Sequence, residues 1–126
     1  MHKSKLAGFI IDCQTTDLAG AAGFWGGALG MKVEALPGTE GQTYRRLADP
    51  SRALTIEVQT VDHPSRVHLD IETDDIEAEV TRLEALGATR VNNVHSWVVM
   101  EAPTGQRFCV VRQSSPNFES TASKWP

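Results

Sequence analysis

The sequence has no excess of positive charge, few aromatic residues and no long hydrophobic segment. Its 126 residues include 12 lysines and arginines against 16 aspartates and glutamates, for a net charge of −4. A chain without a basic stripe to neutralise phosphates is a poor match for nucleic acid or an anionic membrane surface. No apolar run approaches the ~20 residues that a membrane-spanning helix needs. We therefore expect neither a nucleic-acid partner nor a membrane partner.

Cysteine is also scarce. The two cysteines, Cys13 and Cys109, lack the C-x-x-C spacing of zinc ribbons and dithiol redox motifs. Two small buried side chains in strands are a simpler prediction than a disulfide or a metal pair. The N-terminal residues lack a secretory hydrophobic segment and lead directly into an alternating pattern, so we expect a cytoplasmic protein.

The clearest pattern in the chain is RVHLDIETDDIEAEVTRLEALGATRV, at 66–91, which predicts strand, helix, turn and strand. Polar residues at 68, 70 and 72 alternate with apolar residues, as in a strand with one polar face. Asp74 is the predicted helix cap, and Glu77 would complete a capping box. Apolar residues at 76, 80, 83 and 86 form the buried stripe, and Gly87 ends the helix.

An earlier segment predicts the same order of elements. A strand over 6–14 precedes a helix that Thr16 or Asp17 caps and Gly30 ends. Four internal glycines weaken this helix, so packing must hold it. The other predicted strands are 31–36, 44–48, 53–59, 88–91, 97–101 and 107–112. We expect loose structure at 1–5, at the 37–42 connection, at a turn at 92–93 and in a mobile tail in which Phe118 or Trp125 can dock.

The two halves of the sequence are related. IIDCQTTD at 10–17 matches HLDIETDD at 68–75 without a gap, and both following helices end in Leu-Gly. Tyr44 lies six residues before Pro50, as Trp97 does before Pro103. Each half therefore reads as a strand, a helix and three strands, which indicates a duplication.

A single unit of this kind cannot bury its sheet alone. We therefore predict an α+β fold, in which two βαβββ modules form a curved mixed sheet around a cleft with the helices outside. The predicted domain covers 1–113, with repeats at about 6–60 and 66–113, and 114–126 is the C-terminal tail.

This pattern resembles the vicinal oxygen chelate superfamily, which includes glyoxalase I, bleomycin resistance proteins and extradiol dioxygenases. The segments RVHLDIETDDIEAEVTRLEALGA, APTGQRFCVV and DLAGAAGFWGGALGMKVE look like those of small bacterial glyoxalase-like domains. The resemblance covers about residues 6–113. It implies a small-molecule ligand in the cleft and a homodimer.

The resemblance also implies where a metal would bind. In metal-using relatives, the first, fourth, fifth and eighth strands supply the ligands, two from each half. Here these positions are Ile10, which cannot ligate, then Glu57 (or Gln59 if the register shifts by two), His68 and Cys109. A thiolate at Cys109 would favour zinc over magnesium or manganese. His68 and Glu57 are thus candidate ligands of an incomplete site. We predict that the protein binds no cofactor, and a site for zinc, manganese, iron or nickel is the second choice.

Cys109 and four more residues are candidates for ligand binding. Asp12 and Asp70 share the polar face of His68, either as substitute ligands or as acids that hydrogen-bond to neighbouring backbone. Tyr44 and Trp97 are core residues or cleft walls that can stack on a flat ligand. His68 itself is equally well a hydrogen-bonded core residue.

The preferred prediction is a glyoxalase-like small-molecule-binding protein with a degenerate metal site, in which His68 and Glu57 make the polar or catalytic contacts. One alternative is a metal-dependent lyase, isomerase or dioxygenase of the superfamily. A second is an antibiotic-sequestering resistance protein, in which an acidic dimer traps a basic drug without chemistry.

Overall fold

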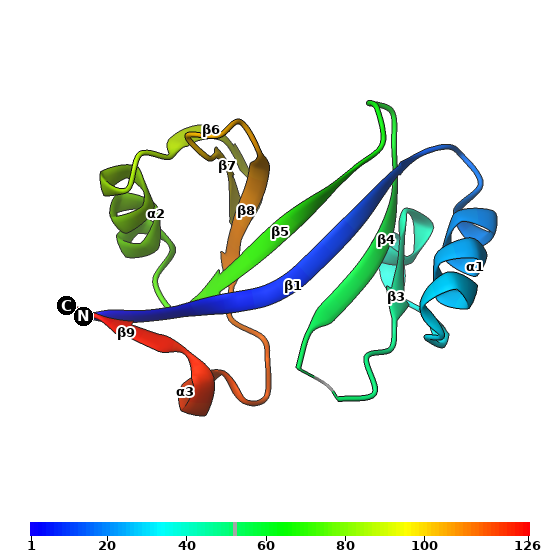
Figure 1. Cartoon of the computed structure of the whole chain (residues 1–126), viewed down its shortest axis with the longest axis horizontal. Coiled ribbons are helices and arrows are strands. Elements are labelled where there is room, and N and C mark those ends of the chain that lie inside the picture. Colours follow the sequence, from blue (N-terminus) through cyan, green and yellow to red (C-terminus); the bar gives the residue numbers. More distant parts are fainter. Residues whose placement is uncertain (52) are drawn as a thin grey trace. The chain divides into compact units, whose positions relative to one another are not determined.

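The computed structural model describes residues 1–51 and 53–126, and these form strands and helices in the predicted α+β arrangement (Figure 1). The first half contains β1 (His2–Gln14), α1 (Leu18–Leu29), β2 (Val33–Ala35), the short 3-10 helix η1 (Gly38–Gln42), β3 (Tyr44–Leu47) and β4 (Thr55–Val61). The second contains β5 (Arg66–Thr73), α2 (Ile76–Ala85), β6 (Thr89–Val94), β7 (Trp97–Glu101), β8 (Arg107–Arg112), α3 (Phe118–Thr121) and β9 (Ser123–Trp125). The strand, helix and three strands expected of each module are confirmed.

The chain divides into two compact units. One, the first unit, is Gly8–Val67, and the other, the second unit, combines Met1–Ala7 with His68–Pro126. The N-terminal residues are therefore part of the second unit, and the expectation that 1–5 is loose is wrong. Within residues 1–51 and 53–126, no helix is long and apolar enough to cross a membrane.

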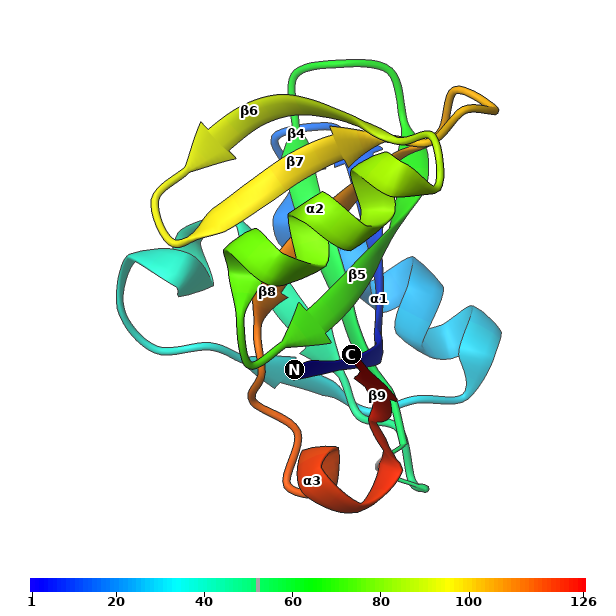
Figure 2. The same cartoon turned by 90° about the vertical axis from the view of Figure 1, so that its left-hand side faces the viewer.

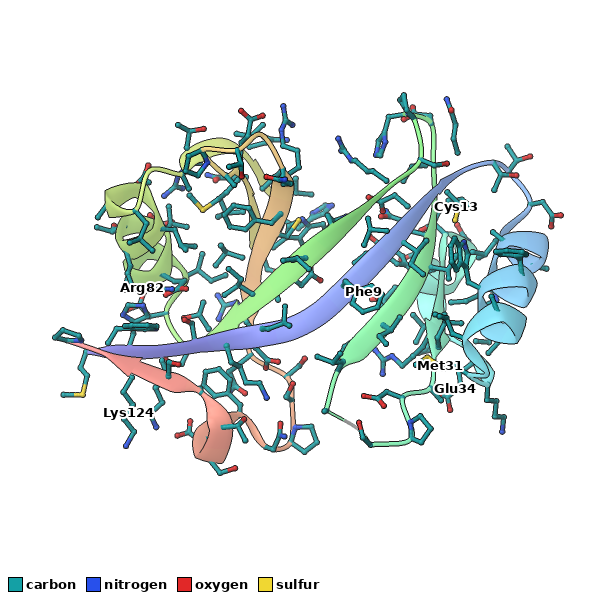
Figure 3. The ribbon with its side chains drawn as sticks, in the orientation of Figure 1. Phe9, Cys13, Met31, Glu34, Arg82 and Lys124 are labelled. Carbon is teal, nitrogen blue, oxygen red and sulfur yellow. The ribbon has the colours of Figure 1, made fainter. Side chains whose placement is uncertain are left out.

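In the first unit, the strands follow the order β2-β3-β4-β1. β1 and β4 run parallel, whereas β4 with β3 and β3 with β2 run antiparallel. The core lies between these strands and α1. Its members are Ile11, Ala22, Leu47, Ile56 and Val58, with Phe9, Cys13, Trp25 and Met31 packed around them. Phe9 and Cys13 come from β1 (Figure 3), which confirms the predicted alternation along this strand.

Helix α1 has the termini that its sequence predicts. The Asp17 carboxylate accepts a hydrogen bond from the Gly20 N–H at 2.9 Å, and Gly30 ends the helix with a φ of +67°. A Cβ built on Gly26 would lie 2.7 Å from Val33 Cγ2. This close approach to β2 is the packing that a glycine-rich helix requires.

In the second unit, β5 runs parallel to β8, and β8-β7-β6 continue antiparallel. Helix α2 packs on β6, β7 and β8 (Figure 2). The core between them comprises Val80, Leu83, Ala88, Val98, Met100 and Val110, with Ile71, Ile76 and Phe108 at its margin.

The cap of α2 differs from the prediction by one residue. Asp75, not Asp74, accepts the capping hydrogen bond, from the Ala78 N–H at 3.1 Å. Asp74 instead accepts from the Lys3 N–H at 2.8 Å, so its carboxylate holds β1 rather than the helix. Glu77 completes no capping box and pairs with Arg90.

Two predicted turns have different outcomes. Gly87 follows α2 with a φ of +110°, as expected. The turn placed at 92–93 is wrong, because both asparagines lie in β6 and the chain reverses at His95, which has a φ of +49°. The connection at 37–42, expected to be flexible, contains η1.

The C-terminal residues are folded, so the expectation of a mobile tail is wrong. Phe118 is 1% exposed, and β9 pairs antiparallel with the start of β1. The fully buried Glu72 accepts hydrogen bonds from the backbone N–H groups of Ser114 and Ser115, both at 3.0 Å. The Glu72 carboxylate of β5 thus fixes the segment after β8, which the polar sequence had led us to expect to be mobile.

A buried charged network joins α2 to both ends of the chain. Glu79 is fully buried and contacts His2 Nε2 at 2.8 Å and the Arg82 guanidinium at 2.7 and 2.9 Å. Arg82 stacks over the Trp125 ring at 3.9 Å and lies beside the start of β1 (Figure 3). Trp125 Nε1 donates to Ser4 Oγ at 2.9 Å. The last residues are thus held by a carboxylate in the middle of α2.

This network sets the ionisation of Glu79. Burial raises the pKa of the Glu79 carboxyl, but hydrogen bonds from Arg82, His2 and Ser4 outweigh it and hold the pKa below its ordinary value of 4.5. A carboxyl with a lowered folded pKa stabilises the fold above its unfolded pKa. That stabilisation is lost as the pH falls through the folded pKa.

We expect Glu79→Gln to destabilise the protein by about 3 kcal/mol near neutral pH. The reason is that the amide NH2 replaces a carboxylate oxygen that contacts His2 and Arg82. Urea unfolding followed by circular dichroism measures the change. The difference from wild type should shrink as the pH falls below 4.5 and through the lowered pKa of the folded-state Glu79 carboxyl. Glu77→Gln is the matched control, since Glu77 pairs with Arg90 at the surface of the same helix. Equal stability of the two variants would contradict the role assigned to Glu79.

Gly8 offers a second test, of the parallel pairing in the first unit. A Cβ on Gly8 would lie 1.8 Å from the carbonyl oxygen of its β4 partner Thr55. Gly8→Ala should therefore cost about 3 kcal/mol or more, because backbone cannot move aside as a flexible side chain does. Gly23→Ala, on the exposed side of α1 with nothing within 4 Å, should stabilise by up to about 1 kcal/mol. Thermal unfolding compares the two, and a neutral Gly8→Ala would refute the close approach.

Candidate functional site

The second unit presents its polar side chains on the sheet face opposite α2. Ile71, Phe108 and Val110 pack in the core against α2. Because side chains alternate along a strand, the residues between them project from the other face. The register then aligns three strands on that face. It carries His68, Asp70 and Glu72 of β5, Arg107 and Cys109 of β8, and Trp97, Val99 and Glu101 of β7.

Three chemically distinct side chains meet on this face. Asp70 and Cys109 are direct partners in the parallel β5–β8 register, and His68 precedes Asp70 by two residues. His68 Nε2 lies 3.5 Å from Asp70 Oδ1, and the two side chains are 15% and 21% exposed. One donor atom from each of His68, Asp70 and Cys109 lies within 4.8 Å of the others. The imidazole, the carboxylate and the free, partly buried thiol therefore form one group, called here the triad.

The first unit carries different residues at the equivalent positions. Aligning IIDCQTTD with HLDIETDD equates Ile10 with His68 and Asp12 with Asp70. Asp12 pairs with Gln59 across β1 and β4, just as Asp70 pairs with Cys109. Gln59 is therefore the equivalent of Cys109. The register therefore favours Gln59 over Glu57, the first choice, as the fourth-strand position of the implied metal-binding pattern.

Glu57 has a structural partner. Arg46 Nη2 lies 3.0 Å from Glu57 Oε2 across β3 and β4. At the equivalent positions of the second unit, Arg107 Nε lies 2.9 Å from Glu101 Oε1. The two modules thus keep the same cross-strand ion pair with its charges exchanged. A catalytic or metal-binding role for Glu57 stays a prediction.

Asp12 and Ile10 lie on the first unit's face opposite α1. The Asp12 side chain is 2% exposed, and Arg66 Nε lies 3.9 Å from Asp12 Oδ2. Ile10 is 4% exposed and offers no donor atom. This unit therefore balances its buried carboxylate with a guanidinium, where the second unit places an imidazole and a thiol.

The aromatic candidates also project away from the helices. Tyr44 lies opposite Gln59, on the face away from α1. Trp97 alternates with Val98, a core residue beneath α2, and its ring lies 5.7 Å from that of His95. The register equates Tyr44 with Val99 rather than with Trp97, so the match counted from the prolines is wrong by two residues. Contact of either ring with a ligand stays a prediction.

The two cysteines occupy different environments. Cys13 packs in the core under α1, as predicted, and burial raises the pKa of its thiol. Cys109 lies beside Asp70 on the second unit's sheet face opposite α2. The local sequences of β1 and β8 do not distinguish the two cysteines, whereas the β5–β8 register places Cys109 beside Asp70.

The metal-binding pattern implied by the resemblance does not fit this chain. That pattern takes two ligands from each module, and Ile10 removes one of them. The triad fits a single ion better, because imidazole, carboxylate and thiolate are all ligands that zinc accepts. The sequence had identified His68 and Cys109 separately and Asp70 as a substitute. What it could not supply was the register that places Cys109 directly beside Asp70.

Comparisons with known proteins agree with this architecture. The family model for a glyoxalase-like domain matches residues 8–111. No curated protein matches the chain. Among solved structures, a hypothetical protein from Bacillus halodurans C-125 has a TM-score of 0.63 at 15% identity, covering 88% of this chain and 95% of that one.

Two further structures have similar folds. Methylmalonyl-CoA epimerase from Mycobacterium tuberculosis has a TM-score of 0.60 at 17% identity, covering 92% of this chain and 91% of its own. A glyoxalase/bleomycin resistance protein/dioxygenase superfamily member from Vibrio splendidus 12B01 has a TM-score of 0.53 at 15% identity, covering 86% and 100%. These likenesses show the fold, and the family match covers most of the sequence. The chain belongs to the glyoxalase-like domain family.

Proposed function

We propose that this glyoxalase-like chain binds a small organic carbonyl compound on the second unit's face opposite α2, with His68 as its main polar contact. The observation that carries the proposal is the His68–Asp70 pair, 3.5 Å apart and partly exposed beside Cys109. A family fold does not specify a substrate, so the site itself must supply the chemistry.

His68 is suited to contact a ligand oxygen. An imidazole N–H donates to a carbonyl or carboxylate oxygen, and the same ring can accept a proton from a neighbouring C–H or O–H group. Asp70 restrains the ring through Nε2 and thereby acts as a positioning residue. The pair can therefore bind a carbonyl compound and move a proton on it.

The fold relatives suggest which compounds to test first. Methylmalonyl-CoA epimerases are among the solved structures with this fold, one of them in complex with methylmalonyl-CoA. Thioester and carboxylate groups both carry acceptor oxygens, to which an imidazole N–H such as that of His68 can donate. We therefore include CoA thioesters and small oxo acids in the class of ligands proposed here.

The test is a thermal-shift series with methylmalonyl-CoA and small 2-oxo acids, in EDTA, on wild type, His68→Gln and His63→Gln. At a ligand concentration a hundredfold above Kd, wild type should gain about 2.7 kcal/mol of stability. His68→Gln should lose most of this gain. His63→Gln, which alters a partly exposed histidine hydrogen-bonded to the Pro64 carbonyl, should keep it.

Two results would contradict the proposal. Equal stabilisation of wild type and His68→Gln would remove His68 from the binding site. Stabilisation by the basic glycopeptide bleomycin, with none by the carbonyl compounds, would support the antibiotic-sequestering alternative instead.

A further inference from the structure

We propose that His68, Asp70 and Cys109 bind one zinc ion, entirely within the second unit. This inference rests on the proposed function only in using the same face of the sheet. It departs from the pattern implied by the resemblance, which draws ligands from both modules.

The spacing of the donor atoms is suited to one ion. Four ligands at zinc bond lengths of about 2.0–2.3 Å sit at the corners of a tetrahedron with edges of about 3.3–3.7 Å. His68 Nε2 and Asp70 Oδ1 are 3.5 Å apart, which is one such edge. One donor atom of each triad member lies within 4.8 Å of the others, so small side-chain rotations complete the set.

The chemistry of the donors selects the metal. Thiolate and imidazole favour zinc, whereas magnesium, calcium and manganese prefer oxygen. A carboxylate as the third ligand keeps the set within the range found for zinc.

The sheet holds the site in place. Asp70 and Cys109 are register partners on adjacent parallel strands, and His68 lies on the same face of β5. Their backbones are therefore fixed by the ladder rather than by a loop. The first unit has the same backbone layout with Ile10, Asp12 and Gln59, so it serves as an internal comparison that lacks both the imidazole and the thiol.

Three protein ligands would leave a fourth position for a ligand oxygen, as in catalytic zinc sites. A zinc ion held by His68, Asp70 and Cys109 would supply Lewis acidity toward a carbonyl. In this arrangement, the residues of β5 and β8 orient the site. The sheet position of the triad then determines where the carbonyl compound binds.

The experiment measures metal binding directly. Wild-type protein should bind one zinc ion per chain by mass spectrometry of metals, and cobalt in its place should give a sulfur-to-cobalt charge-transfer band. Cys109→Ser should abolish the band, and Cys13→Ser, the matched change in the core under α1, should keep it. Zinc affinity should fall by more than about 100-fold in His68→Gln and Cys109→Ser, beyond the loss caused by outer-shell changes.

Cys13→Ser keeps the test decisive even if Cys109→Ser does not fold, because a band that persists without Cys13 can come only from Cys109. No zinc in wild type, a cobalt spectrum without the sulfur band, or a band lost in Cys13→Ser overturns the site. The EDTA binding series tests the proposed function separately. Ligand binding that depends on His68 without zinc would leave the proposed function standing while the zinc site fails.

Discussion

The parallel pairing of the first and last strands of each module is the constraint on which the rest of this structure depends. Parallel strands cannot be joined by a tight turn, so a helix and two further strands lie between them in the chain. In each unit, that crossover packs the helix on one face of the unit's own strands and leaves the opposite face uncovered by that helix. In the second unit, the same pairing puts Asp70 opposite Cys109.

Duplication has kept the scaffold and changed the chemistry. The cross-strand ion pair survives in both modules with its charges exchanged, as Arg46 with Glu57 and Glu101 with Arg107. The positions that form the triad have diverged instead, with Ile10 where the second unit has His68. An ion pair between neighbouring strands depends only on opposite charges, whereas a ligand site depends on each atom. The two modules thus share this ion pair while carrying different side chains at the positions of the triad.

The unit that carries the triad is completed by residues from both ends of the chain. His2 and Trp125 meet on α2 through Glu79 and Arg82, and buried Glu72 holds the segment after β8. Buried carboxylates are costly unless they are fully hydrogen-bonded, and these two are well supplied with donors. The network therefore ties sequence-distant segments to one sheet and links acid stability to Glu79.

The sequence by itself determined the duplicated order of elements, the alternating polar face of β5 and the family, because these depend on periodicity and on short motifs that neighbouring residues carry. It also identified every member of the triad as a candidate. Only the tertiary structure decided that Gln59 rather than Glu57 matches Cys109, that Asp75 caps α2, and that Phe118 and Trp125 are packed. Strand register and the docking of distant segments depend on contacts between residues far apart in the chain, and local patterns contain no record of them.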